Sequence, residues 1–265
     1  MGRTKGPLRL NTFLHTPVIG APPRLPLPAP SPAVALRARQ QLTPVTPITG
    51  WGLPLAAALL VALPVFLQAP WVRLAPFSAA LFTAPLLLAG VALAQRRPPV
   101  WSTAGVLLVG FSGSWLGGCL FWGWCRLHPL WHLPIEAFAL PLAVAGLGGR
   151  WRLAGSFYLA SLAGTACTDA VMALTGVMQR WTAVLQAPLD QAPVLLHQAA
   201  QGVLQPLPLA ATLLAAWLLV DQCRRYWHHP DPAWRLAASA IATTLAVDGL
   251  FLAAALWAPQ LSGLI

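Results

Sequence analysis

The sequence predicts an all-α protein: a polytopic bundle of about seven transmembrane helices with a cytoplasmic N-terminus. Three observations lead to this prediction. Hydrophobic residues make up 57% of the 265 residues and charged residues only 8%, whereas a soluble domain carries about 25% charged residues. The mean hydropathy is +0.67. From Trp51 onward, the chain contains successive apolar stretches long enough to cross a bilayer, which takes about 20 residues.

These stretches divide the chain into three regions. Residues 1–49 contain ten prolines, six Lys or Arg residues and no acid, a composition that predicts a disordered, basic, Pro-rich tail. Residues 50–258 are expected to form the transmembrane bundle, and residues 259–265 a short C-terminal tail. The expected spans lie at 51–69, 74–94, 100–123, 131–148, 153–177, 204–221 and 233–257. Tryptophan gathers near their ends, as in an interfacial aromatic belt.

The basic residues predict the orientation of these spans. If the N-terminal tail is cytoplasmic, thirteen Lys or Arg residues fall on the cytoplasmic side, and the opposite side carries only Arg73, Arg126 and Arg180. This asymmetry is the positive-inside pattern of membrane proteins. Because the basic residues lie between apolar runs and not on one soluble face, we expect a lipid bilayer as the environment and no nucleic-acid partner.

The longest loop between expected spans, 178–203, would then lie on the non-cytoplasmic side. Apolar residues recur in it at helical spacing, for example Leu196, Ala199 and Val203. We interpret it as an interfacial amphipathic helix broken by Pro188 and Pro193, with a re-entrant lid as the alternative.

Several kinds of chemistry lack a sequence signal. The four cysteines show no CxxC spacing, which favours buried thiols over a disulfide framework or a metal site. The chain has no phosphate-binding loop, no dinucleotide fingerprint and no zinc-protease motif. We therefore expect no cofactor and no resident metal.

The densest polar segment surrounds His128, His132 and Glu136, which stand four residues apart. On one continuous helix the three side chains would share a face, as proton-relay or metal-binding side chains do. Alternatively, the helix begins at Pro134, a favourable first position. Glu136 would then lie in the first turn and the histidines in a surface loop. Both alternatives stay open.

Three acids lie inside expected spans at similar depth. Glu136, Asp169 and Asp248 are about five, eight and nine residues from the non-cytoplasmic edge, or roughly 8, 12 and 14 Å at 1.5 Å per residue. Ionisable groups in hydrocarbon are costly and usually functional. We expect the three acids to line one cavity as binding residues, with Glu136 and the two histidines as candidate catalytic groups. Arg126 is the basic neighbour that could pair with one of them.

The segment His128-Pro-Leu-Trp-His-Leu-Pro-Ile-Glu136-Ala, followed by an apolar helix, resembles a cyanobacterial family of multi-pass membrane proteins classed as a domain of unknown function. The resemblance covers about residues 50–258 and implies a thylakoid or plasma membrane, with no assigned activity. Residues 133–138 are similar to the Pro-x-Glu-Glu motif of small membrane-bound lycopene cyclases. Those enzymes pair two carboxylates, whereas Ala137 stands in the second place here, so that only Glu136 matches.

Three functions remain open. The protein could be a small-solute or proton-coupled carrier that uses Glu136, Asp169 and Asp248 as protonatable sites. It could be a membrane enzyme that acts on a lipid or isoprenoid with Glu136 as general acid and a histidine assisting. It could also be an accessory or assembly subunit of a photosynthetic membrane complex, with a protein partner or as a homodimer. We rank the carrier first.

Overall fold

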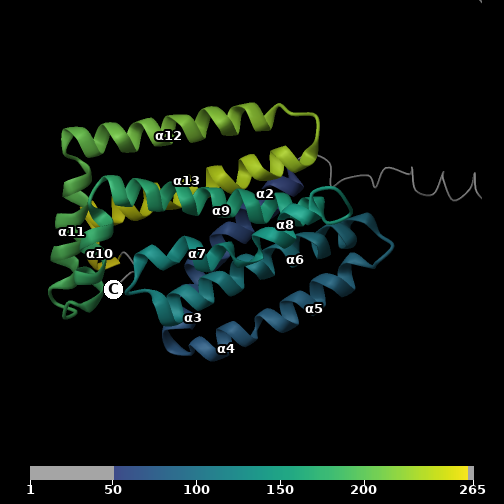
Figure 1. Ribbon diagram of the computed structural model, residues 1–265, viewed down its shortest axis with the longest axis horizontal. Coiled ribbons are helices and arrows are strands. Elements are labelled where there is room, and N and C mark those ends of the chain that lie inside the picture. Colours follow the sequence, from purple (N-terminus) through teal and green to yellow (C-terminus); the bar gives the residue numbers. More distant parts are fainter. Residues whose placement is uncertain (1–50, 262–265) are drawn as a thin grey trace, which may run out of the picture. The chain divides into compact units, whose positions relative to one another are not determined.

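The computed structural model describes residues 51–261. The predicted tail at 1–49 and the last four residues lie outside them. The described chain is a bundle of helices with no strand (Figure 1), which confirms the predicted all-α fold. Its longer helices are α2 (Gly52–Leu63), α5 (Thr83–Ala94), α6 (Pro99–Leu120), α9 (Arg152–Leu174), α12 (Pro206–Trp227) and α13 (Pro232–Trp257). Two shorter helices complete the first hairpin, α3 (Ala69–Leu74) and α4 (Pro76–Leu81).

Within this described range, six helical stretches are long and apolar enough to cross a membrane. They are Gly52–Leu74, Pro76–Ala94, Pro99–Cys125, Arg152–Leu174, Pro206–Trp227 and Pro232–Trp257. Each coincides with one of the expected spans. Two contain a π-helical turn, at Pro64–Gln68 and at Phe121–Cys125, where the helix accommodates an extra residue without ending.

The expected fourth span, 131–148, is the exception. Here the chain forms four short pieces: a 3₁₀ turn at Pro129–Trp131, α7 (His132–Glu136), a 3₁₀ turn at Ala137–Ala139 and α8 (Leu140–Gly146). Pro129, Pro134 and Pro141 explain the interruptions, because each proline lacks a backbone donor and crowds the preceding turn. The apolar segment lies where the sequence predicts it, but its backbone is broken into short pieces and does not form one helix.

The broken segment nevertheless runs alongside α9 in the opposite direction (Figure 1). Four close approaches fix this order: Ala143 to Gly155, Ala139 to Tyr158, Glu136 to Thr165, and His132 to Asp169. The fourteen steps along α9 from Gly155 to Asp169 span about 21 Å, most of a hydrocarbon core about 30 Å thick. The segment therefore returns the chain from the end of α6 to the start of α9. The cytoplasmic N-terminus stays a prediction.

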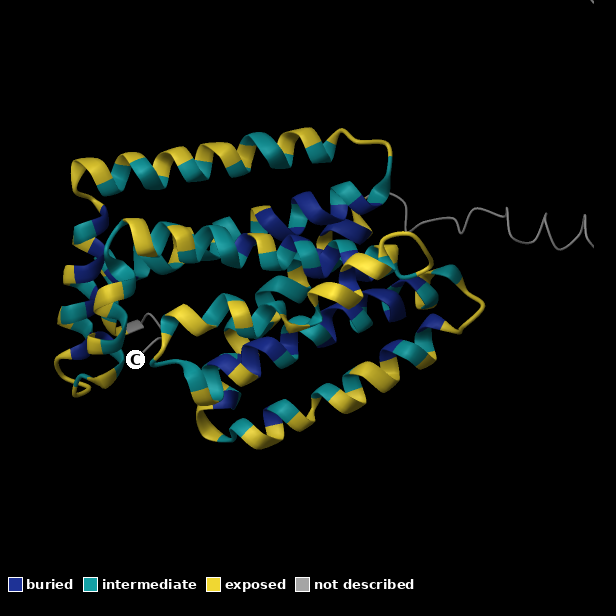
Figure 2. Ribbon diagram, in the orientation of Figure 1, coloured by how far each residue is buried: buried dark blue, intermediate teal, exposed yellow. Residues whose placement is uncertain are grey.

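Helix α6 lies at the centre of the described bundle and contacts α5, α9 and α7. It is the most buried of the six spans, and Figure 2 shows it mainly in the colours of buried and intermediate residues. Small residues let its neighbours approach closely. A Cβ added at Gly105 would lie 2.2 Å from the backbone nitrogen of Ala94 in α5, and one at Gly110 would lie 2.6 Å from the Ala154 carbonyl of α9.

The 178–203 loop forms two helices, α10 (Val177–Gln186) and α11 (Ala192–Val203). They are separated by residues 187–191, so the expected helical spacing and the break near Pro188 are confirmed. The expected break at Pro193 is wrong, because Pro193 lies in the first turn of α11, where a proline fits the helix. Leu196, Ala199 and Val203 are all buried. Val184, Leu196 and Ala200 pack on Ala255 of α13, which attaches this pair of helices to one end of the bundle.

The opposite end of the bundle is held by polar contacts between its turns. Arg152 at the start of α9 forms an ion pair with Asp231, and Asp231 also caps α13 by accepting from the Ala233 backbone amide at 2.9 Å. Arg150 donates to the Ala94 carbonyl at 3.4 Å. These contacts join the α5–α6, α8–α9 and α12–α13 turns at one end, where most of the arginines of the described chain lie.

We predict that Gly105→Ala destabilises the bundle by about 1–3 kcal/mol, because the new methyl group would meet backbone atoms of α5 that have no room to move. Thermal unfolding of the purified protein in detergent measures the effect. Gly148→Ala is the control, since nothing lies within 4 Å of a Cβ at that position. Equal melting temperatures for the two variants would contradict the close α5–α6 contact.

Candidate functional site

The candidate site begins on α7, which places His132 and Glu136 one helical turn apart on the same face. Their side chains meet, with His132 Nε2 lying 3.3 Å from Glu136 Oε1. The helix continues through Pro134, whereas His128 precedes the 3₁₀ turn that starts at Pro129. The structure therefore combines the two alternatives from the sequence: His132 and Glu136 share a helix face, and His128 lies in an exposed connection before it.

The neighbouring helix α9 supplies the partners of both groups. Asp169 Oδ1 lies 2.9 Å from His132 Nδ1, and the Thr165 hydroxyl donates to Glu136 Oε2 at 3.0 Å. The side chains of His132 and Glu136 are each 19% exposed and that of Asp169 is 13% exposed. We name Glu136, His132 and Asp169 the acid–histidine cluster. Two of the three acids expected to lie together are thus joined, by way of one imidazole ring.

The two nitrogen–oxygen contacts of His132 determine how many protons the cluster holds. Each of the two nitrogen–oxygen contacts needs one proton between its atoms, because an ionised carboxylate accepts only. An imidazolium between two carboxylates satisfies this condition. A neutral imidazole with one protonated and one ionised carboxyl satisfies it equally. Both arrangements carry a net charge of −1, so the cluster can take up one further proton and become neutral.

The walls of the cluster hold the imidazole in place. The Phe121 ring, in the π-helical turn that follows α6, lies 4.2 Å from the His132 ring, centroid to centroid, with the planes inclined at 32°. Helices α6 and α7 also pack closely at Gly117, where an added Cβ would lie 3.1 Å from the Glu136 Cα. An apolar face and a packed backbone therefore limit the positions that the ring can adopt.

Tyr158 of α9 bridges the break that follows α7. Its hydroxyl donates to the Glu136 carbonyl and accepts from the Ala139 backbone amide at 3.2 Å. Gly113 of α6 makes room for the phenol ring, because a Cβ there would lie 3.2 Å from two ring atoms. A single side chain thus supplies partners for backbone groups exposed where the helix is interrupted.

Asp248 on α13 lies next to the cluster but makes its own contact. The Thr168 hydroxyl, one residue before Asp169, donates to Asp248 Oδ2 at 2.5 Å. No ion pair of the described residues joins Asp248 to His132. The expected three-acid site therefore consists of one joined pair and one adjacent carboxyl.

Arg126 and His128 lie outside the cluster. The Arg126 carbonyl accepts from the Trp181 indole at 2.9 Å, and the Leu127 carbonyl accepts from the Thr182 hydroxyl at 3.1 Å. Both bonds hold α10 against the connection after α6. Within residues 51–261, no ion pair joins Arg126 to an acid. The suggested Arg126–carboxylate pair is not formed.

Sequence reasoning did not assign site roles to Phe121, Tyr158 or Gly117. An aromatic residue or a glycine inside an apolar span gives no signal of its own, because packing alone accounts for it. Thr165 and Thr168 carried a usable signal, since both lie within one turn of Asp169 on the expected helix.

We predict that Tyr158→Phe destabilises the protein by about 1–2 kcal/mol, because it leaves backbone groups at Glu136 and Ala139 without the hydroxyl partner. Unfolding in mixed detergent measures the change. Tyr226→Phe on α12 is the control, because the Tyr226 hydroxyl makes none of the hydrogen bonds found among the described residues and its ring packs on Trp234. A Tyr158→Phe protein as stable as this control would show that water or another group replaces the bridge.

No curated protein and no solved structure matches this chain. A family model does match, over residues 57–256, and its description is "Protein of unknown function (DUF3120)". The match covers the six long apolar helices almost completely, together with the broken segment and the acid–histidine cluster. The chain therefore belongs to the DUF3120 family, whose function is unknown.

Proposed function

We propose that this membrane protein is a proton-coupled carrier of a small solute and that the acid–histidine cluster binds the coupling proton. One observation supports the proposal above the others. Both ring nitrogens of His132 face carboxylate oxygens, at 2.9 and 3.3 Å, between helices of an apolar bundle. Ionisable groups placed in this way inside membrane proteins belong to proton relays and coupling sites.

The charge of the cluster gives the coupling a simple mechanism. With a net charge of −1 the cluster attracts a proton or a cationic solute, and after one proton binds it is neutral. The two states differ in how strongly they hold α7 to α9, because the two nitrogen–oxygen contacts and the Thr165 bond depend on which oxygens carry protons. Protonation is thereby linked to the contact between the two segments.

The broken segment gives this linkage a short helical element. Discontinuous helices carry the ion and substrate sites of many secondary transporters, where the interrupted backbone lines the site. Here α7 has five residues and the 3₁₀ turn after it has three. A piece of this length can shift against α6 and α9 without unfolding a whole span. Asp248, bonded to Thr168, offers a second carboxyl to which a proton could pass.

The enzyme hypothesis, with Glu136 as general acid toward a lipid or isoprenoid, receives less support. A general acid must present its proton to the substrate. One Glu136 oxygen lies 3.3 Å from His132 and the other accepts from Thr165, so both are engaged inside the protein.

The accessory-subunit hypothesis is supported by α12. This helix contains no buried residue, and Leu207, Leu213, Trp217 and Leu218 are exposed along it. Figure 2 shows the helix in the colours of exposed and intermediate residues. Lipid covers such a helix as well as a protein partner does, so the hypothesis ranks second.

The test is transport by the full-length protein in proteoliposomes that contain the pH dye pyranine. A panel of amino acids, organic acids, amines and sugars is added outside, and internal pH is followed. We expect at least one solute to move protons through the wild type. We expect Glu136→Gln to slow that flux by about tenfold or more, because the cluster loses an ionisable oxygen needed for its proton.

Asp190→Asn is the matched control, since it also removes one carboxylate but from the exposed connection between α10 and α11. Wild-type flux in Glu136→Gln would refute the role of the cluster. A wild type that moves no proton with any solute would refute the carrier and leave the accessory subunit as the function to pursue.

A further inference from the structure

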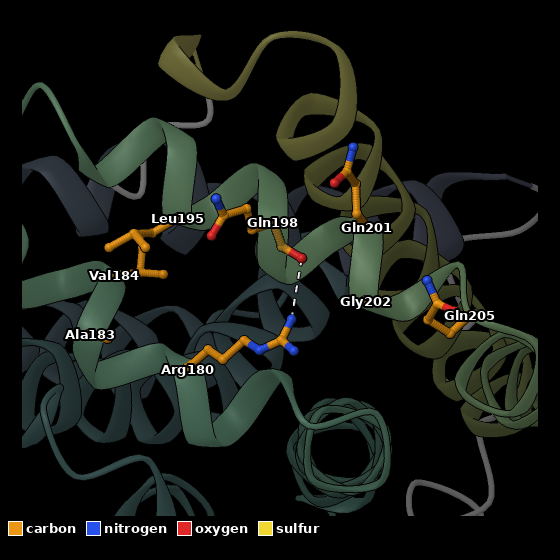
Figure 3. Close-up of a pocket in the computed structure, with 8 residues that line it drawn as sticks. All are labelled: Arg180, Ala183, Val184, Leu195, Gln198, Gln201, Gly202 and Gln205. Carbon is orange, nitrogen blue, oxygen red and sulfur yellow. Dashed lines mark hydrogen bonds between the residues drawn. The ribbon is translucent and has the colours of Figure 1, made fainter.

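A hollow of about 670 Å³ lies between α10 and α11, away from the acid–histidine cluster. Its polar side carries Arg180 from α10, Gln198 from α11, and Gln205 just before α12 (Figure 3). Its apolar side carries Ala183, Val184 and Leu195. The hollow is therefore amphipathic, with one cation and carboxamides facing aliphatic side chains.

The Arg180 guanidinium is placed at this hollow by two features of α11. Nη1 donates to the Gln198 carbonyl at 3.2 Å, as Figure 3 shows. Gly202 leaves the space that the guanidinium occupies, because a Cβ there would lie 2.7 Å from Nη1. Any larger residue at this position would displace the cation.

The charge of Arg180 is not neutralised by an acid of the described chain. None of the ion pairs within residues 51–261 includes it. A guanidinium has five N–H donors in a planar fork. In Arg180, one of its nitrogens donates to the main-chain carbonyl of Gln198. The fork matches phosphate oxygens, which it can bind in pairs.

The surroundings of the hollow favour an amphiphile. Helices α10 and α11 connect α9 to α12, two helices long and apolar enough to cross a membrane. A helix pair of this kind lies along the membrane surface, where lipid head groups are found. An oxyanion at Arg180 would have aliphatic side chains near it, Ala183 and Val184 on the same helix and Leu195 on α11, and an acyl chain can pack there.

We propose that the hollow between α10 and α11 binds a phosphate-type oxyanion through Arg180, carried on an anionic membrane lipid whose first acyl carbons pack on Ala183, Val184 and Leu195. The same oxyanion chemistry is available to free phosphate. This site is separate from the acid–histidine cluster, and it does not depend on the carrier function.

Native mass spectrometry of the detergent-solubilised full-length protein tests the proposal. The probes are phosphatidylglycerol and phosphatidylcholine with identical acyl chains. We expect the wild type to retain phosphatidylglycerol preferentially and Arg180→Gln to lower that affinity about tenfold, since a charge-assisted hydrogen-bond pair is lost. Arg224→Gln is the control, because it removes one exposed arginine from the last turn of α12.

Gly202→Ala provides a second variant that keeps the charge but displaces the guanidinium, and it should weaken phosphatidylglycerol binding as well. Excess inorganic phosphate distinguishes the two sources of the oxyanion. No displacement of the lipid identifies a lipid site, whereas displacement, or retention of phosphate itself, identifies a site for the free ion. Equal losses in Arg180→Gln and Arg224→Gln would overturn the proposal, as would a wild type that retains neither probe.

Discussion

The structure depends on one constraint of the bilayer: a backbone group inside hydrocarbon needs a hydrogen-bond partner within the protein. A proline-broken segment can occupy membrane depth only where other helices shield it. The segment at 129–146 meets this condition through α9, which contacts both α7 and α8, and through α6, which contacts α7 and the 3₁₀ turn after it. Tyr158 bonds the backbone at its main interruption, and Gly113, Gly117 and Gly155 let the flanking helices come close enough to do so.

The same constraint explains how much of the fold could be predicted. Six spans follow from apolar length alone, because any helix of that length and composition satisfies its own backbone. The fourth expected span had the composition but not the continuity, and its prolines were visible in the sequence. The backbone path around these prolines could not be predicted from the sequence. Helix α7 continues through Pro134 for a single turn, because neighbouring helices hold it there.

The candidate site shows a similar division. The four-residue spacing of His132 and Glu136, and the similar depth of Asp169, were sufficient to bring these residues into one hypothesis. The pairing of His132 with Asp169 was not predictable, because it depends on the register between α7 and α9, which is set by contacts at Tyr158 and Gly155 many residues away. Asp248 had the same depth but faces Thr168, since depth fixes a level in the membrane and not a direction around the helix.

The position of Asp169 also has an electrical consequence. It lies five residues before the end of α9 at Leu174, or about 8 Å along the helix, which is about a quarter of a hydrocarbon core about 30 Å thick. In the proposed carrier, a proton that travels from that end to the cluster would cross about a quarter of the transmembrane potential. At 100 mV, where a full crossing is worth about 2.3 kcal/mol, this fraction amounts to about 0.6 kcal/mol. In the proposed carrier, the membrane voltage would therefore change the affinity of the cluster for its proton about threefold.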